Sequence, residues 1–250
     1  MRAAPPEFED LLTPRGKRVL AGTHPLCGAL ADPSRKFVAA RGLVDARKAA
    51  RLRDALDAAL LDCLSPMSQP IPPQTFTQMR HNYGELLPKT ARVSTAYLDH
   101  PRQRAYRIAQ ELGVVELLRS QSLRAFAEAV TGRALRKRNG MQLLCYRPGD
   151  YAGPHNDHHP EDPEAAHGYT DFHLTLCTPS VAQQLLVYGR RGHFTEVANV
   201  ASLGGITIYR LPFWHFTTPL VAKRGREQAA RRWVMLGTFL DSAPRPAFGS

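Results

Sequence analysis

The sequence is poor in cysteine, in acidic residues and in long apolar runs. Its 250 residues hold four cysteines without paired spacing, which excludes a disulfide scaffold. No stretch reaches the roughly 18 uncharged apolar residues of a membrane span, and no short repeat predicts a coiled coil. The first 20 residues show no secretory signal. We therefore expect a globular cytoplasmic protein with no membrane segment and with reduced, mostly buried thiols at Cys27, Cys63, Cys145 and Cys177.

Acidic residues are scarce relative to basic ones, in one part of the chain above all. The formal net charge is +11, and residues 1–140 hold 23 Lys and Arg against 13 Asp and Glu. Residues 141–250 are nearly balanced, with 10 against 9. The excess is explained either by an anionic substrate or nucleic acid, or by an ordinary solvated basic face. The second explanation is preferred, because no recognised nucleic-acid motif accompanies the charge.

The first half of the chain predicts a helical region preceded by an irregular arm. Residues 1–36 lack periodicity and are expected to lie as an arm over the surface. Residues 37–40 predict a short strand, and Asp45 is a suitable N-cap for a helix that ends before Ser65-Pro66. Further expected segments are an extended loop over 66–73, with four prolines, and helices over 101–113 and 115–131. We interpret residues 37–134 as a mainly helical support region.

From residue 135 onward, short β-rich runs are separated by Gly and Pro turns. Runs of this kind without intervening helices predict a sandwich or barrel. The fold class expected is therefore α+β: one domain in which N-terminal helices pack on an antiparallel core over 135–240, followed by a tail over 241–250. The predicted strands cover 141–146, 172–177, 184–188, 206–210, 214–221 and 233–240.

A cluster of histidines directly after the first of these strands predicts a metal site. Five of the ten histidines lie between His155 and His173. In extended chain, residues i and i+2 point the same way, so His155 and Asp157 can converge on one metal. His215 is the best third ligand, because an unpaired imidazole in its apolar, aromatic strand would be costly. Two histidines and one carboxylate form the facial triad of non-haem iron(II) oxygenases.

With this order of residues, the chain resembles the Fe(II)/2-oxoglutarate-dependent oxygenase superfamily, in the pattern of its prolyl-hydroxylase-like branch. The resemblance covers roughly residues 135–240 and implies a double-stranded β-helix, a cupin-like jelly roll. It implies Fe(II) bound by His155, Asp157 and His215, with 2-oxoglutarate and dioxygen as co-substrates. The implied reaction releases succinate and carbon dioxide and hydroxylates an unactivated C–H bond of an unidentified substrate.

The resemblance also implies a basic residue that binds the far carboxylate of 2-oxoglutarate. Arg232 is preferred, because an apolar strand follows it, while Arg224 and Arg226 lie in polar, turn-like sequence. A register error of one residue would exchange Arg232 for Arg231. Tyr146 is expected to donate its hydroxyl to the co-substrate, although simple packing explains it equally well. The paired glycines often found in the middle of the family core are replaced here by Gln183-Gln184.

Other assignments stay open. His159-Pro160-Glu161 also fits the His-x-carboxylate pattern but lies in an acidic, loop-like run, and His158 and His167 are expected to be exposed or to face the substrate. His173 is either a pocket residue or a core histidine. The alternative functions are a cupin-like metalloprotein that does not use 2-oxoglutarate, and a nucleic-acid-binding module that uses the basic N-terminal region. The substrate, which the basic charge allows to be anionic, is not specified by the sequence.

Overall fold

In the computed structural model, 13 strands and a small set of helices are described over residues 3–70, 90–157, 168–190 and 193–242. Eleven strands belong to one antiparallel sheet with the order β1-β10-β6-β13-β4-β3-β5-β11-β8-β9, in which β2 pairs with β3. Strands β7 and β12 form a separate pair. The strands are β1 Phe37–Ala40, β2 Ser65–Pro70, β3 Thr90–Tyr97, β4 Leu135–Tyr146, β5 Tyr151–His155, β6 Tyr169–Cys177, β7 Val181–Gln183, β8 Leu185–Arg190, β9 His193–Asn199, β10 Leu203–Leu211, β11 His215–Thr217, β12 Val221–Ala222 and β13 Arg232–Asp241.

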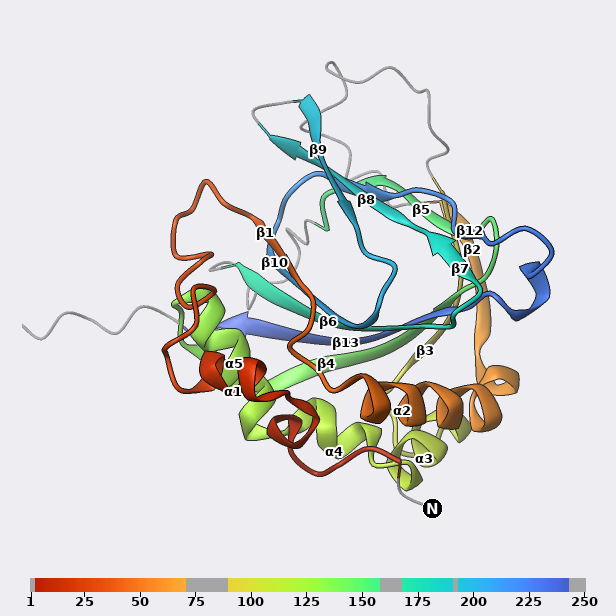
Figure 1. Ribbon diagram of the computed structural model, residues 1–250, viewed down its shortest axis with the longest axis horizontal. Coiled ribbons are helices and arrows are strands. Elements are labelled where there is room, and N and C mark those ends of the chain that lie inside the picture. Colours follow the sequence, from red (N-terminus) through yellow and green to blue (C-terminus); the bar gives the residue numbers. More distant parts are fainter. Residues whose placement is uncertain (1–2, 71–89, 158–167, 191–192, 243–250) are drawn as a thin grey trace, which may run out of the picture.

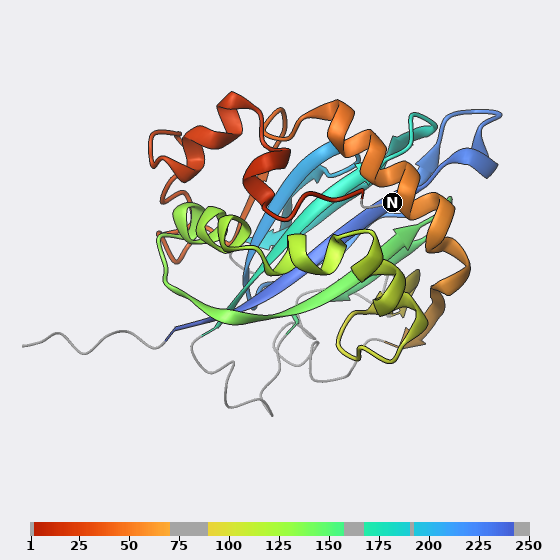
Figure 2. The ribbon, with the colours of Figure 1, turned by 90° about the horizontal axis from the view of Figure 1, so that it is seen from below.

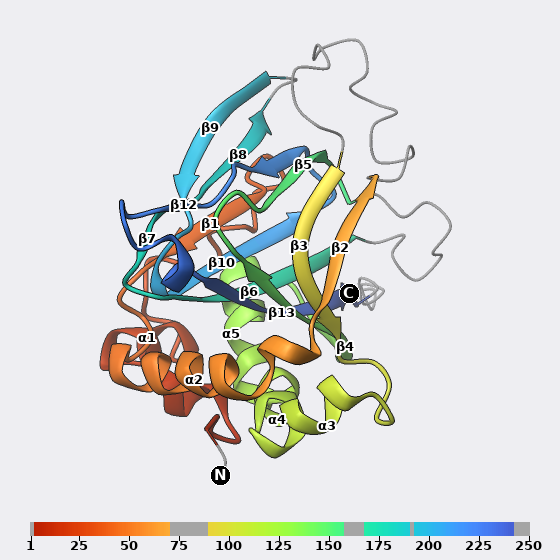
Figure 3. The same cartoon turned by 90° about the vertical axis from the view of Figure 1, so that its right-hand side faces the viewer.

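The large sheet curls over itself, so that it makes two facing layers. Strands β10, β6, β13 and β4 form the layer next to the helices, and β5, β11, β8 and β9 form the opposite layer (Figures 1 and 3). Over the described strands the sheet is not fully closed, because β1 and β9 stand at the two ends of its strand order. The architecture is the double-stranded β-helix, and it confirms the α+β class predicted from the sequence.

Helices cover the outer face of the first layer (Figure 2). They are α1 Pro14–Leu20, α2 Ala46–Ala59, α3 Arg104–Glu111, α4 Val114–Arg119 and α5 Gln121–Thr131. Asp45 caps α2 as predicted, because its side chain accepts a hydrogen bond from the backbone N–H of Lys48 at 2.9 Å. Within the described ranges, no helix combines the length and apolar character that crossing a bilayer requires.

Strict alternation along the strands divides each layer into a core-facing side and a barrel-facing side. On β13, Trp233, Met235 and Phe239 pack toward the helices, whereas Val234 and Leu236 belong to a separate cluster inside the barrel.

The four cysteines are free, as predicted. Only Cys145 and Cys177 are fully buried, and burial raises their pKa values to about 12 and about 11, so both stay protonated.

The prediction of a surface arm over residues 1–36 is wrong. Phe8 is completely buried, and its ring packs edge-on against Phe126 of α5 and Phe172 of β6, with ring centroids 5.5 and 5.2 Å away. Leu11 and Val19 are buried in the same core. The segment consists of a 3₁₀ turn over Phe8–Leu11 and the short helix α1, and elements this short show no periodicity in the sequence.

Two further predictions require correction. The helix expected over 115–131 is two helices, because Ser120 adopts an extended conformation and caps α5 by accepting from the N–H of Leu123. The proline-containing loop expected from residue 66 is in part a strand, since Ser65–Pro70 pairs with β3. This strand lies off the main path of the sheet, and among the described strands it pairs with β3 alone; prolines are tolerated at such edge positions. Residues 71–73 lie outside the described ranges.

Asp57 of α2 joins the helical layer to β13 and provides a stability prediction. One carboxylate oxygen accepts from Arg231 Nε at 3.1 Å and from Trp233 Nε1 at 2.8 Å. The substitution Asp57→Ala leaves both donors without this acceptor, so we expect a loss of about 1–3 kcal/mol in the free energy of unfolding. Urea unfolding at pH 7 measures it. Asp57→Asn keeps an acceptor oxygen and should lose less; equal losses in the two variants would contradict the role of these hydrogen bonds.

Candidate metal centre

Direct strand pairing brings the two predicted histidine ligands together. His155 ends β5, and His215 begins β11, where the two residues are antiparallel partners in register. Their ring centroids are 4.4 Å apart. A tight turn from Arg147 to Asp150 leads into β5, and in it Asp150 accepts from the N–H of Arg147 at 2.8 Å. Two residues that are 60 positions apart in the sequence therefore meet in the layer formed by β5, β11, β8 and β9.

Asp157 completes the group just beyond the end of β5. Its Oδ1 lies 3.3 Å from His155 Nε2, and its Oδ2 lies 3.4 Å from His215 Nε2. Potential ligand atoms of the three residues all lie within 4.8 Å of one another. Two ligands at right angles, each about 2.1 Å from one ion, are roughly 3 Å apart, so these spacings are close to those of a shared metal. Asp157 has a φ of +54°, a left-handed conformation that Asp tolerates better than most residues.

Backbone carbonyl groups orient both imidazoles for metal binding. His155 Nδ1 lies 2.6 Å from the carbonyl oxygen of Gly153, and His215 Nδ1 lies 2.9 Å from that of Phe213. A ring nitrogen facing a carbonyl oxygen must carry the proton, which leaves the Nε2 lone pair free on each ring. Both Nε2 atoms face Asp157. The donor set fits one divalent ion bound by two neutral imidazoles and one carboxylate.

The environment of His215 disfavours its protonation. His215 is 5% exposed, and burial lowers its pKa to about 4, with the neighbouring His155 acting in the same direction. The neutral imidazole that metal binding requires is therefore retained well below the ordinary histidine range. The charge of Asp157 opposes this shift but does not outweigh it.

This pKa predicts how the stability of the metal-free protein changes with pH. In the unfolded chain His215 titrates near 6.5, and in the folded chain near 4. The unfolded state therefore takes up a proton first, so the free energy of unfolding falls as the pH falls from 6.5 toward 4. Between pH 6.5 and 5 the loss should be about 2 kcal/mol, at about 1.36 kcal/mol per unit. Urea unfolding of chelator-treated wild type and His215→Phe at both pH values tests it; an identical slope in the variant would contradict it.

Arg232, the residue preferred for the far carboxylate, lies inside the barrel. It is 2% exposed, and its Nη1 donates to Gln184 Oε1 at 3.0 Å, while Nη2 lies 3.4 Å from Thr175 Oγ1. Its Nε has no hydrogen-bond partner among the described residues. No carboxylate of the described residues pairs with this guanidinium. A buried cation with neutral partners and a free donor is costly unless an anion joins it.

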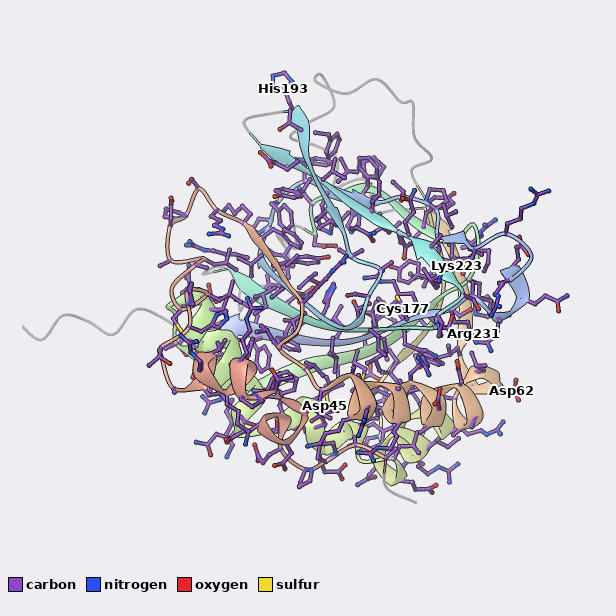
Figure 4. The ribbon with its side chains drawn as sticks, viewed as in Figure 1. Asp45, Asp62, Cys177, His193, Lys223 and Arg231 are labelled. Atoms are coloured by element: carbon purple, nitrogen blue, oxygen red, sulfur yellow. The ribbon has the colours of Figure 1, made fainter. Side chains whose placement is uncertain are left out.

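The other arginines considered from the sequence do not face the barrel interior. Arg231 points to the outer face, where it pairs with Asp57, and Figure 4 shows it on the right, just before β13 begins. Arg224 and Arg226 are exposed in the connection between β12 and β13. Of the four arginines, Arg232 is therefore the one whose side chain is buried inside the barrel.

Tyr146 lies between Arg232 and the metal ligands. The Arg232 guanidinium carbon is 5.2 Å from the centre of the Tyr146 ring, and the two residues are cross-strand partners on β4 and β13. The side chain of Thr217, two residues beyond His215, lies close enough to the Tyr146 hydroxyl to affect its pKa. Burial raises the pKa of Tyr146, so its hydroxyl stays protonated and can donate a hydrogen bond.

Gln184 is a site residue that the sequence did not reveal. It is fully buried, and its amide nitrogen donates to the carbonyl groups of Thr218 at 3.0 Å and Asp150 at 3.2 Å. These bonds fix the amide so that its oxygen faces Arg232. In the sequence, Gln183-Gln184 stands out only as a departure from a family pattern. A polar residue next to an apolar strand was the available signal.

The other histidines that the sequence raised as site candidates divide into two groups. His173 faces the barrel interior, where its ring contacts Tyr209 at a centroid distance of 4.5 Å. Tyr209 in turn lies 5.4 Å from His215, and the sequence gave no reason to expect it in the site. His158, His159 and His167, with Glu161, lie outside the described residues.

Of the comparisons with known proteins, the one with solved structures supports the fold. Neither a family model nor a curated protein matches the chain. Among solved structures, a prolyl-4-hydroxylase from Pseudomonas putida covers 87% of this chain and 100% of its own, with a TM-score of 0.51 and 15% identity. An oxidoreductase of the 2OG-Fe(II) oxygenase family from Burkholderia pseudomallei covers 93% and 94%, with a TM-score of 0.52 and 15% identity.

A third solved structure extends the range of chemistry on this fold. The non-haem alpha-ketoglutarate-dependent carbocyclase SnoK from nogalamycin biosynthesis matches with a TM-score of 0.52 and 13% identity, and covers 86% of this chain and 83% of its own. At such identities the likeness shows the fold, the double-stranded β-helix on which these oxygenases are built. The substrates of these proteins differ, so the fold does not select one.

Proposed function

We propose that this protein is a non-haem iron(II) and 2-oxoglutarate-dependent dioxygenase that hydroxylates an unactivated C–H bond and releases succinate and carbon dioxide. In this proposal His155, Asp157 and His215 hold the iron. Arg232 and Tyr146 hold the far carboxylate of 2-oxoglutarate. The likeness in fold to solved oxygenases supports the reaction class.

The observation that carries the proposal is the buried guanidinium of Arg232 in the same interior as the three metal-ligating side chains. A guanidinium forms two parallel hydrogen bonds with a carboxylate, and Arg232 Nε is a buried donor with no partner among the described residues. Thr217 follows His215 on β11 and lies near Tyr146, whose ring centre is 5.2 Å from the Arg232 guanidinium carbon. The interior therefore offers a metal at one end and a carboxylate site at the other, which suits a short 2-oxo diacid.

The chain's own residues account for binding, orientation and exclusion of water. When bound, ferrous iron with 2-oxoglutarate and dioxygen supplies the oxidising power to break a C–H bond. The carbonyl groups of Gly153 and Phe213 fix the orientation of the two imidazoles and the ring nitrogen that carries the proton. Gln184 and Thr175 hold the Arg232 side chain in place. Burial of Tyr146 and Arg232 excludes water from the carboxylate site, which strengthens charged hydrogen bonds there.

An anaerobic titration tests cofactor use directly. The iron(II) protein is titrated with 2-oxoglutarate while the visible absorption band of the metal–oxo acid complex is recorded, and succinate is then measured after admission of air. We expect a one-to-one complex and succinate formation that requires both iron and 2-oxoglutarate. Metal binding without 2-oxoglutarate binding would overturn the proposal in favour of a cupin-like metalloprotein.

A further inference from the structure

The inward face of β6 carries two chemically active side chains that the metal centre does not use. Phe172 points toward the helices, where it contacts Phe8 and Phe126, so alternation turns Asp171, His173 and Thr175 toward the barrel interior. Both Asp171 and His173 are 8% exposed. A buried carboxylate beside a buried imidazole requires an account, because groups of this kind are rarely enclosed without partners.

The Asp171 carboxylate is only partly satisfied. Its Oδ1 accepts from the hydroxyl of Thr238 at 2.6 Å. The nitrogen of His173 that faces Oδ2 is Nε2, which is 3.9 Å away. No Lys or Arg of the described residues pairs with this carboxylate. One hydrogen bond from a neutral hydroxyl is a poor match for a charge with about four acceptor positions.

Within the described part of the chain, the imidazole of His173 also lacks a hydrogen-bond partner on the side that faces Asp171. His173 Nε2 is buried and has no hydrogen-bond partner among the described residues. The 3.9 Å that separates it from Asp171 Oδ2 is too long for a direct hydrogen bond. One nitrogen that donates to both atoms, at about 2.9 Å from each, closes this gap. A protonated primary amine has the required charge and three donors.

The position of this pair relative to the metal centre is suited to a substrate. Tyr169 lies two residues before Asp171 on the same face of β6 and donates its hydroxyl to the backbone carbonyl of the metal ligand Asp157. Thr175, at the other end of the row, contacts Arg232. Asp171 and Thr175 are four residues apart, about 13 Å along a strand. The interior therefore has a cationic end for an oxo diacid and an anionic end, next to the metal ligands, for another molecule.

We infer that Asp171 and His173 bind the primary ammonium group of the molecule that is oxidised, and that this substrate is a small amine of the free amino-acid class. This inference rests on the proposed function for the identity of the reaction. Binding of the amine does not depend on the proposed function, because Asp171 and His173 accept the ammonium group whether or not dioxygen reacts. An amino acid also suits the basic protein, since it brings a carboxylate together with its ammonium group.

Calorimetry and turnover together test the inference on the full-length protein. The twenty free L-amino acids, each paired with its N-acetyl derivative, are titrated into the cobalt(II) protein without oxygen, with and without 2-oxoglutarate. The same set is then added to the iron(II) protein in air, and succinate is measured. We expect at least one free amino acid to bind and to raise succinate formation at least tenfold, while its N-acetyl form does neither. Equal behaviour of the two forms, or no response to any member, would overturn the inference.

Two variants and one control locate the effect. Asp171→Asn keeps the size of the side chain and an acceptor for Thr238, and it should weaken amino-acid binding at least tenfold while 2-oxoglutarate binding is unchanged. His173→Gln should weaken it several-fold, which keeps the test decisive if Asp171→Asn does not fold. Asp99→Asn removes one negative charge from an exposed site and should bind like wild type. If Asp171→Asn binds the amino acid as well as wild type does, the inference is refuted. If the wild-type protein does not bind 2-oxoglutarate, the proposed function alone is refuted.

Discussion

The double variant His155→Ala/Asp157→Ala should lose its divalent metal. These two residues supply two of the three side chains whose ligand atoms lie within 4.8 Å of one another. Loss of a hydrogen-bonding partner of a ligand already costs about 10–100-fold in metal affinity, so the loss of two ligands should cost at least about 1000-fold. Calorimetric titration of the chelator-treated protein with cobalt(II) at pH 7.5 measures the affinity, and succinate formation should fall to background.

His193→Ala is the matched control for that experiment. His193 is an exposed histidine at the start of β9, and Figure 4 shows it at the far end of the molecule from the helices. Its removal should leave cobalt affinity and succinate formation at wild-type values, which rules out surface histidines as the source of binding. Full metal binding by the double variant would mean that the ion is held elsewhere, and the assignment of the ligands would fail.

The His-x-Asp spacing was enough to select His155 and Asp157, but the alternation of an extended chain is not what brings them together. Strand β5 ends at His155, and Asp157 has a φ of +54°, so a change of backbone direction after the strand turns its carboxylate toward the imidazole. His215 was selected by a different argument, the cost of a polar side chain in an apolar strand. That it lies directly opposite His155 depends on the pairing of β5 with β11, which the sequence does not encode locally. The sequence therefore predicted the members of the group, and the fold supplied their contact.

The sequence alone could not decide whether Arg231 or Arg232 faces the barrel interior. Alternation says that the two point to opposite faces, but it does not say which face is the interior. The hydrogen bonds from Arg231 and Trp233 to Asp57 of α2 decide it, since they hold the odd-numbered residues of β13 against the helices. Gln184 and Asp171 could not be recognised for the same reason, because Gln184 contacts Arg232, 48 residues away, and Asp171 contacts Thr238, 67 residues away.

Replacing Arg232 should separate 2-oxoglutarate binding from metal binding. In Arg232→Met the side chain keeps most of its length but cannot donate, so the two charged hydrogen bonds to the far carboxylate disappear. Hydrogen bonds to charged groups contribute about 1.5–3 kcal/mol each, so the affinity for 2-oxoglutarate should fall at least about 100-fold. Cobalt affinity should not change, because Arg232 supplies no ligand. Calorimetric titration of the cobalt(II) protein with 2-oxoglutarate in the absence of oxygen measures the difference.

Stability and a neighbouring variant decide what a loss of affinity in Arg232→Met means. Removing a buried charge that has only neutral partners should not unfold the protein, so the melting temperature should move by no more than about 4 °C, the shift that roughly 1 kcal/mol produces in a chain of this size. Arg231→Met removes the same chemical group one residue away on the outer face, and it should keep wild-type affinity for 2-oxoglutarate. If Arg231→Met lost affinity and Arg232→Met kept it, the carboxylate site would lie outside the barrel. If both kept it while wild type binds the oxo acid, no guanidinium of β13 would be needed, and the buried charge of Arg232 would require another anion.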